Sequence, residues 1–186
     1  PNLFEIIQVS PDDETLKAGL IAAKKYGIDK KFRQIKDAGI GKPAGLNLGI
    51  KDAKGSIIVQ TDGDTYLGKD SIENLVKPLR NRSIGVVTGR PMSQNSINTF
   101  FGYIHTLAFD VAHKQRLENV NDKNIFEKFL TASGYLMAFR KEIDPMPNNV
   151  LDDVYISLEL HKKGYSMAYS PLSTVFVKGP TNIKDY

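Results

Sequence analysis

Two aspartates separated by one glycine follow an apolar run. Residues 56–60 read Ser-Ile-Ile-Val-Gln and lead through Thr61 into Asp62, Gly63 and Asp64. The run predicts a β-strand buried on both faces, with both carboxylates at its carboxyl end and Gly63 allowing a tight bend. Mg²⁺ is usually held by one or two carboxylates together with substrate phosphates. Because Asp-Gly is also a common turn pair, the motif indicates either a metal and phosphate site or a plain turn.

Asp152 and Asp153 form a second acidic pair. They follow a segment rich in proline and asparagine at residues 145–149, where the pattern predicts the start of a helix. Acidic side chains in a first helical turn are commonly explained by capping and by the helix dipole. Taken alone, this pair therefore favours a structural role over a catalytic one.

Lys42 stands in a glycine-rich turn, between Gly41 and Pro43. Proline suits the first position of a helix, and a lysine at a helix start can bind a phosphate group. The Gly-x-x-x-x-Gly-Lys-Ser/Thr spacing of a Walker loop is absent. The turn alone is thus weak evidence for phosphate binding.

These residues would be positioned by alternating strands and helices. The patterns predict strands at residues 4–9, 32–35, 56–60, 84–88, 135–139, 167–169 and 174–177. They predict helices from Asp12 or Asp13 to Gly27, from Pro43 to Gly55, and at residues 71–79, 95–119 and 151–163. Such alternation indicates parallel βαβ units in an α/β sheet, whose ligands bind beyond the carboxyl ends of the strands.

The helix expected at residues 95–119 carries an apolar stripe. Its members are Ile97, Phe101, Ile104, Leu107 and Val111. A stripe this apolar must be covered, either by the domain itself or by other parts of a longer protein. Part of it is expected to face a membrane section in that longer protein.

The composition excludes several classes of function. The chain has 186 residues, 41% of them hydrophobic and 25% charged, which fits one globular domain. The absence of cysteine excludes a disulfide scaffold, a thiolate zinc site and a cysteine nucleophile. A net charge of +4 is too small to argue for nucleic acid, so no nucleic-acid partner is expected.

Four segments, taken in order, resemble glycosyltransferase family 2, whose members have the GT-A nucleotide-sugar fold. Residues 41–50 are similar to that family's GKPAALNAGI-like stretch, and residues 53–65 to its AKGEIIVFLDADT segment. Residues 133–141 resemble its GSGAAFRR strand, and residues 151–158 its TEDTDLGLRL element. The resemblance covers residues 4 to 179 and implies a GT-A-like, Rossmann-like, mostly parallel sheet flanked by helices.

The resemblance also implies roles for single residues. Asp62 and Asp64 would hold a divalent metal, Mg²⁺ or Mn²⁺, and the nucleoside diphosphate. Asp153 matches the family's catalytic base, and Asp152 takes the position of the glutamate before it.

Other donor-binding positions follow from the same resemblance. Lys42 and Asn47 would contribute to the donor site. Ser10 and Pro11 stand where the family usually has an aspartate pair, so Asp12 and Asp13 are the substitutes expected there. The family's opening apolar strand, which carries an early nucleoside contact, has no counterpart in this sequence.

Residues 1–186 are accordingly expected to form a single nucleotide-sugar-binding catalytic domain, cut from a longer enzyme of the cellulose- or hyaluronan-synthase-like type. That enzyme would be attached to the cytoplasmic face of a membrane through segments outside this sequence. The expected reaction is an inverting transfer of a sugar from a nucleoside-diphosphate sugar to the hydroxyl of a carbohydrate or lipid-linked acceptor. Two alternatives stay open: a nucleotidyltransferase of similar fold, and an inactive nucleotide-binding fragment.

Overall fold

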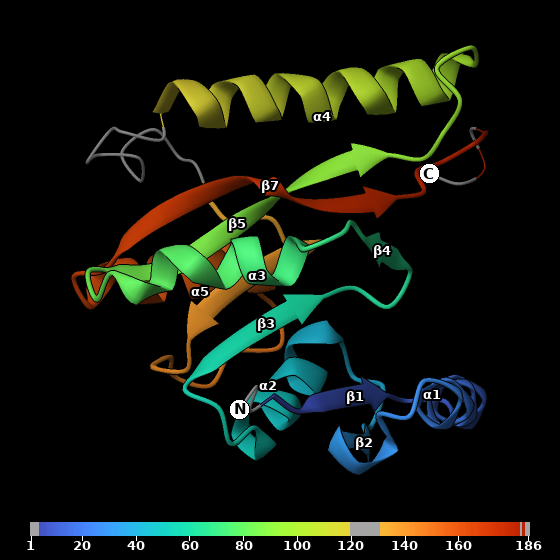
Figure 1. Ribbon diagram of the computed structural model, residues 1–186, viewed down its shortest axis with the longest axis vertical. Helices are drawn as coiled ribbons and strands as arrows, with labels where there is room; N and C mark the ends of the chain where they lie inside the picture. The colour runs from blue at the N-terminus through green and yellow to red at the C-terminus, as the bar shows by residue number, and fades with distance from the viewer. Residues whose placement is uncertain (1–3, 120–130, 183, 185–186) are drawn as a thin grey trace.

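The computed structural model describes residues 4–119, 131–182 and 184. Strands and helices alternate through the first half of the chain (Figure 1). The strands are β1 (Ile6–Ser10), β2 (Phe32–Lys36), β3 (Ile57–Thr61), β4 (Thr65–Leu67), β5 (Ile84–Ser93), β6 (Leu136–Arg140) and β7 (Ser166–Val177). The helices are α1 (Asp13–Lys25), α2 (Lys42–Asp52), α3 (Ser71–Val76), α4 (Phe100–Asn119) and α5 (Asp152–Lys162), with 3-10 turns at Asp29–Lys31 and Lys77–Arg80. The α/β class expected from the sequence is confirmed.

The strands form a mixed arrangement rather than a mostly parallel one. β1 and β2 pair in parallel, and a five-stranded sheet has the order β3-β6-β5-β7-β4. In that sheet only β5 and β7 run parallel, whereas β6 is antiparallel to β3 and β5, and β4 is antiparallel to β7. β6 begins beside the end of β3, because Leu136, its first residue, pairs with Thr61, the last residue of β3. This direction brings the loop before β6, rather than the loop after it, to the edge of the sheet where β3 ends.

Two strands differ from the sequence expectation in extent. β7 is one continuous strand, where short strands were expected at residues 167–169 and 174–177, because it pairs with β5 on both sides of an irregularity in register. β4 was not expected, since three residues are too few to show a periodic pattern. β4 matters for the site because it begins at Thr65, directly after Asp64, and so makes the turn that carries Asp62 and Asp64 short.

The core lies on both faces of the central strands. Leu136, Met137, Ala138 and Phe139 of β6 are all fully buried, two against α5 and two against α3. β3, in contrast, is only partly buried, and its first residue Ile57 is exposed. The expectation that β3 is buried on both faces is wrong, because β3 is an edge strand of its sheet and, among the described strands, pairs with β6 alone.

α4 lies along β5 and β7 (Figure 1). Much of the apolar surface of α4 is exposed. Phe101, His105 and Phe109 are half-buried, whereas Phe100 is 73% exposed and Val111 57% exposed. Ile97, Ile104 and Leu107 are also exposed. Within the described residues, the expected stripe is therefore not covered by the domain, apart from Phe101. None of the described helices has both the length and the hydropathy needed to cross a membrane.

Candidate active site

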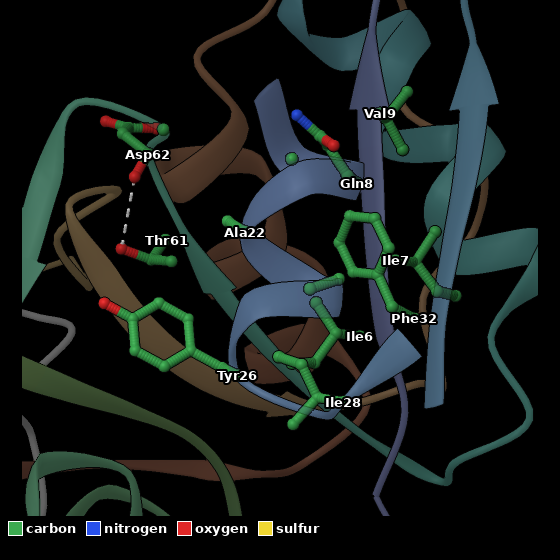
Figure 2. A pocket seen from close by; sticks show the side chains of 13 residues that line it. Ile6, Ile7, Gln8, Val9, Ala22, Tyr26, Ile28, Phe32, Thr61 and Asp62 are labelled. Carbon is green, nitrogen blue, oxygen red and sulfur yellow. Dashed lines mark hydrogen bonds between the residues drawn. The ribbon is translucent and has the colours of Figure 1, made fainter. Parts of the chain in front are cut away.

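Two cavities open where the carboxyl ends of β1 and β3 approach each other, and they share Val9, Thr61, Asp62 and Gly63. One, of about 360 Å³, is lined by apolar side chains of β1 and α1 (Figure 2). The other, of about 400 Å³, is bordered by the start of α2, including Gly41 and Lys42. The second cavity thus combines a helix N-terminus, a lysine and the end of β3.

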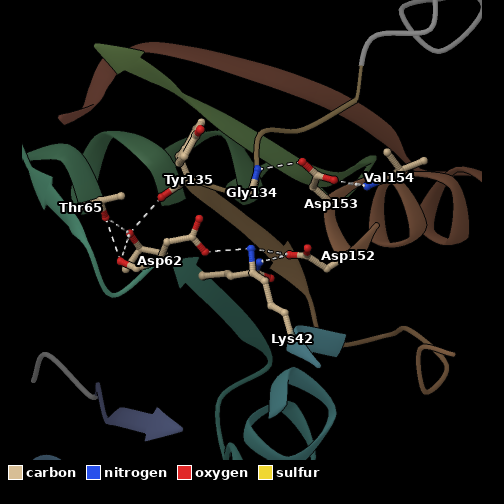
Figure 3. A network of polar contacts seen from close by, with 10 residues as sticks. Lys42, Asp62, Thr65, Gly134, Tyr135, Asp152, Asp153 and Val154 are labelled. Atoms are coloured by element: carbon tan, nitrogen blue, oxygen red, sulfur yellow. Dashed lines mark hydrogen bonds and ion pairs between the residues drawn. The ribbon is translucent and has the colours of Figure 1, made fainter. Parts of the chain in front are cut away.

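Asp62 is held in place by hydroxyl groups around its main chain. Thr65 Oγ1 donates to the carbonyl oxygen of Asp62 at 2.9 Å, and Thr61 Oγ1 donates to the carbonyl oxygen of Tyr135 at 2.9 Å. The hydroxyls of Thr61 and Thr65 are themselves 2.8 Å apart. These bonds fix the turn after β3 against the loop that precedes β6, and the Asp62 carboxylate points towards Lys42 (Figure 3).

Lys42, the first residue of α2, joins the two acidic segments. Its Nζ lies 2.8 Å from Asp62 Oδ1 and 3.2 Å from Asp152 Oδ2 (Figure 3). Burial by itself would lower the pKa of Lys42, but the hydrogen bond to Asp62 and the charge of Asp152 outweigh it, so this pKa is raised. The lysine is therefore held in its charged form between two carboxylates.

Asp152 is the more buried member of the second acidic pair. Its Oδ2 accepts a 2.5 Å hydrogen bond from Gln60 Nε2 as well as the contact from Lys42. Gln60 is the one residue of β3 that is buried, and its polar side chain interrupts an otherwise apolar run. A buried carboxylate requires such partners, since an unpaired buried charge is strongly unfavourable.

Asp153 is oriented by main-chain donors. Its Oδ2 accepts a 3.0 Å hydrogen bond from the Gly134 N–H, and its Oδ1 accepts a 2.8 Å bond from the Val154 N–H. A methyl group added to Gly134 would lie 3.4 Å from both Asp153 Oδ2 and Lys42 Nζ, and 3.7 Å from Asp152 Oδ2. The absence of a side chain at Gly134 therefore keeps open the space that these three groups surround.

The charges of several of these acids act on the hydroxyl group of Tyr135. Its pKa is raised, first by burial and then by the negative charges of Asp62, Asp64 and Asp153. Asp64 itself is exposed. The structure thus gathers Lys42, Asp62, Asp152 and Asp153, all named from the sequence, beside the loop before β6. Asp64 lies two residues after Asp62, in the turn between β3 and β4.

The other three sequence-predicted residues have structural partners. Asp12 caps α1, where its Oδ1 accepts the Thr15 N–H at 2.7 Å. Asp13 forms an ion pair with Lys36. Asn47 exchanges two hydrogen bonds with the main chain of Met146, at 2.8 and 2.9 Å, and so ties α2 to the segment before α5.

Three residues of the site were missed by sequence reasoning. Asp37 lines the 400 Å³ cavity and follows β2 directly, so the rule that selected Asp62 at the end of a strand would also have selected it. Gln60 was detectable as a polar residue within an apolar run. For Gly134, the sequence carried no such signal. Within the described part of the chain, no three His, Cys, Asp or Glu side chains are arranged to hold a metal ion.

Residues 7–186 match the family model described as "Glycosyltransferase like family 2". The chain belongs to glycosyltransferase-like family 2. It is 25% identical over 190 residues to the poly-beta-1,6-N-acetyl-D-glucosamine synthases of Staphylococcus aureus (strain COL) and Staphylococcus epidermidis. Each alignment covers 96% of this chain and 44% of the relative, so this family member spans less than half the length of these curated relatives.

Solved structures show the same fold. A mannosyltransferase from Pyrobaculum calidifontis, in complex with GDP-Man and Mn²⁺, matches with a TM-score of 0.70 and 21% identity, over 96% of this chain and 49% of that one. GalNAc-T7 with UDP, GalNAc and Mn²⁺ matches with a TM-score of 0.64 and 16% identity, over 94% of this chain and 38% of that one. These neighbours are GT-A glycosyltransferases, so the family 2 chain has the GT-A fold that the sequence resemblance implied.

Proposed function

We propose that the chain binds a nucleoside-diphosphate sugar and transfers its sugar, with inversion, to an acceptor hydroxyl. The observation that carries this proposal is the position of Lys42 between Asp62 and Asp152, with Asp153 on the other side of Gly134. Lys42 and Asp62, which suit a leaving diphosphate and its metal, thus border the same open space as Asp153, which suits proton removal. Family membership supports the same reaction class.

The donor diphosphate would bind at the N-terminus of α2. No side chain caps this helix, because its N-cap is Gly41 with φ 124°, so the N–H groups of Lys42 and Ala44 can face an anion, whereas Pro43 between them has no N–H. Lys42 adds a positive charge at the same point. The 400 Å³ cavity beside it would take the nucleoside, with the Asp37 carboxylate available to accept hydrogen bonds from hydroxyl or N–H groups.

Asp62 and Asp64 are the residues that would hold a divalent cation. Asp62 Oδ1 fits this role because it already contacts a cationic group, the Lys42 ammonium, and oxygen ligands suit Mg²⁺ and Mn²⁺. A cation there would neutralise charge on the leaving diphosphate. The Mn²⁺ in both neighbouring complexes supports the assignment.

Asp153 would act as general base. In the transfer, the acceptor oxygen forms a bond to the anomeric carbon while the bond from that carbon to the diphosphate breaks. Asp153 takes the hydroxyl proton, and attack opposite the leaving group inverts the configuration. The Gly134 and Val154 N–H groups orient its carboxylate, whereas Asp152 positions Lys42 and Gln60.

The acceptor is proposed to be a carbohydrate or a lipid-linked sugar, in line with the polysaccharide named for the Staphylococcus relatives. Attachment to the cytoplasmic face of a membrane is proposed to occur through segments outside these 186 residues. The exposed apolar side of α4 supports such an attachment.

Calorimetry with a panel of nucleoside diphosphates, including GDP and UDP, with and without Mn²⁺, tests the donor site. Binding of one diphosphate that depends on Mn²⁺ is the expected result. Preference for the corresponding triphosphate would instead indicate a nucleotidyltransferase. Binding of the diphosphate by the 186-residue chain, with no sugar transfer by that chain, would indicate an inactive nucleotide-binding fragment.

A further inference from the structure

The Lys42 ammonium contacts the same Asp62 carboxylate to which the proposed function assigns a divalent cation. Its Nζ contacts the Asp62 carboxylate at 2.8 Å and the Asp152 carboxylate at 3.2 Å. Asp152 is almost fully buried, and apart from Lys42 its described partner is the neutral amide of Gln60. The lysine thus supplies the positive charge that a buried carboxylate requires in the ligand-free site.

The lysine is not locked into this position. Its side chain is 44% exposed and rises from the first turn of α2, at the border of the 400 Å³ cavity. A four-carbon stem with a terminal ammonium can rotate from one anion to another at little cost. A diphosphate in the cavity would be such an anion, close to the same helix N-terminus.

We infer that Lys42 is an internal counter-cation, which competes with a divalent metal for Asp62 and moves to the diphosphate when the donor binds. The inference rests on the proposed function, because it requires a diphosphate at α2. It assigns Lys42 a positioning role that couples two ligands. Metal alone binds weakly because it must displace the ammonium, and the diphosphate strengthens metal binding because it attracts the ammonium and adds oxygen ligands.

The coupling has a defined thermodynamic form. The factor by which a diphosphate raises the affinity for Mn²⁺ must equal the factor by which Mn²⁺ raises the affinity for the diphosphate. Removing the ammonium should strengthen binding of Mn²⁺ alone and weaken binding of the diphosphate alone. The factor by which the diphosphate raises the affinity for Mn²⁺ should therefore become smaller. If Lys42 had only a structural role, this factor would not change.

The test measures Mn²⁺ affinity by electron paramagnetic resonance, with and without the diphosphate that wild-type protein binds. For Lys42→Gln, we expect affinity for Mn²⁺ alone to rise about fivefold or more, at the low end of measured couplings between sites. Lys42→Arg keeps the charge and should bind Mn²⁺ as weakly as wild type. Lys51→Gln removes the same charge from an exposed position on the same helix and should change neither affinity.

Equal affinity of wild type and Lys42→Gln for Mn²⁺ alone would overturn the inference. If Lys42→Gln does not fold, reductive methylation of wild-type protein gives the same information, with Lys51 as internal reference. Saturating Mn²⁺ should free the Lys42 ammonium and increase its methylation rate relative to Lys51, and an unchanged ratio would contradict the inference. Failure of the proposed function would give a different result. In that case no nucleoside diphosphate would bind, but Lys42→Gln would still bind Mn²⁺ more tightly than wild type.

Discussion

The Gly134 N–H donates a 3.0 Å hydrogen bond to Asp153 Oδ2, which joins the loop before β6 to the first turn of α5. Because Gly134 is followed by Tyr135, whose carbonyl oxygen accepts a bond from Thr61, the same short loop also contacts the end of β3. Two main-chain groups, one residue apart, therefore set the distance between the proposed base and the proposed metal ligands.

Asp153→Asn should separate proton removal from donor binding. We expect transfer by the full-length protein to fall about 10²- to 10⁴-fold, the usual contribution of a general base. Donor binding should stay near that of wild type. Since an amide can accept only one of the two N–H bonds made by Asp153, stability should fall by about 0.5–1.5 kcal/mol.

The measurements for this variant are calorimetry with the donor diphosphate, a transfer assay and urea unfolding. If Asp153→Asn kept full transfer activity, the carboxylate would have only its structural role at the start of α5.

Asp64→Ala should abolish metal-dependent binding of a nucleoside diphosphate. Asp64 is exposed, so its loss should leave the thermal midpoint of the ligand-free protein almost unchanged. Calorimetry in the presence of Mn²⁺ and thermal unfolding measure the two effects. Asp29→Ala removes an exposed carboxylate from another part of the surface and should leave binding intact. Undiminished binding by Asp64→Ala would remove this residue from the metal site.

Glu5→Gln should change how stability depends on pH. Hydrogen bonds from the Lys54 N–H and from Arg33, each 2.6 Å long, lower the pKa of Glu5. A lowered folded-state pKa means that the stabilisation is complete above the ordinary value of about 4.5 and is lost as pH falls through the folded value. The stability difference between wild type and Glu5→Gln should therefore be largest near neutral pH and shrink on acidification.

Urea unfolding between pH 2.5 and 7, about the range over which carboxylates titrate, measures this difference. Glu14→Gln, at an exposed carboxylate in the first turn of α1, is the matched control. A difference between wild type and Glu5→Gln that stayed constant across this range would show that the ionised form of Glu5 is not preferentially stabilised by folding.

The outward face of α4 should matter for association and not for folding. Leu107→Ser combined with Val111→Ser changes exposed positions, so the thermal midpoint of the chain should hardly fall. The ring of Phe109 packs edge-on against the ring of Tyr135, with the two ring centroids 5.8 Å apart. Phe109→Ser should therefore lower the thermal midpoint clearly. In the full-length protein, the double variant should reduce recovery with membranes, measured by flotation on a density gradient. Unchanged recovery would contradict a membrane role for this face.

Local patterns in the sequence were sufficient for most of the elements, though not for β4 or the full length of β7, and for several single residues. The apolar run before Asp62, the helix start at Asp12 or Asp13 and the proline at the start of α2 each depend on neighbours within a few residues. Such effects act through backbone conformation and short-range hydrogen bonds, so they can be read without knowing the fold. Asp62 became a site candidate in this way, whereas Asp153 became one through the family resemblance.

Contacts between distant segments were decided only by the tertiary structure. The pairing of Asn47 with Met146 spans 99 positions, and that of Gln60 with Asp152 spans 92. The exposure of β3 follows from its place at the edge of the sheet. Helical periodicity alone did not show which side of α4 faces β5. The sequence by itself determined which groups are available for chemistry. The antiparallel entry of β6 decided that Lys42, Asp62 and Asp153 share one site, because it brings Gly134 to the end of β3.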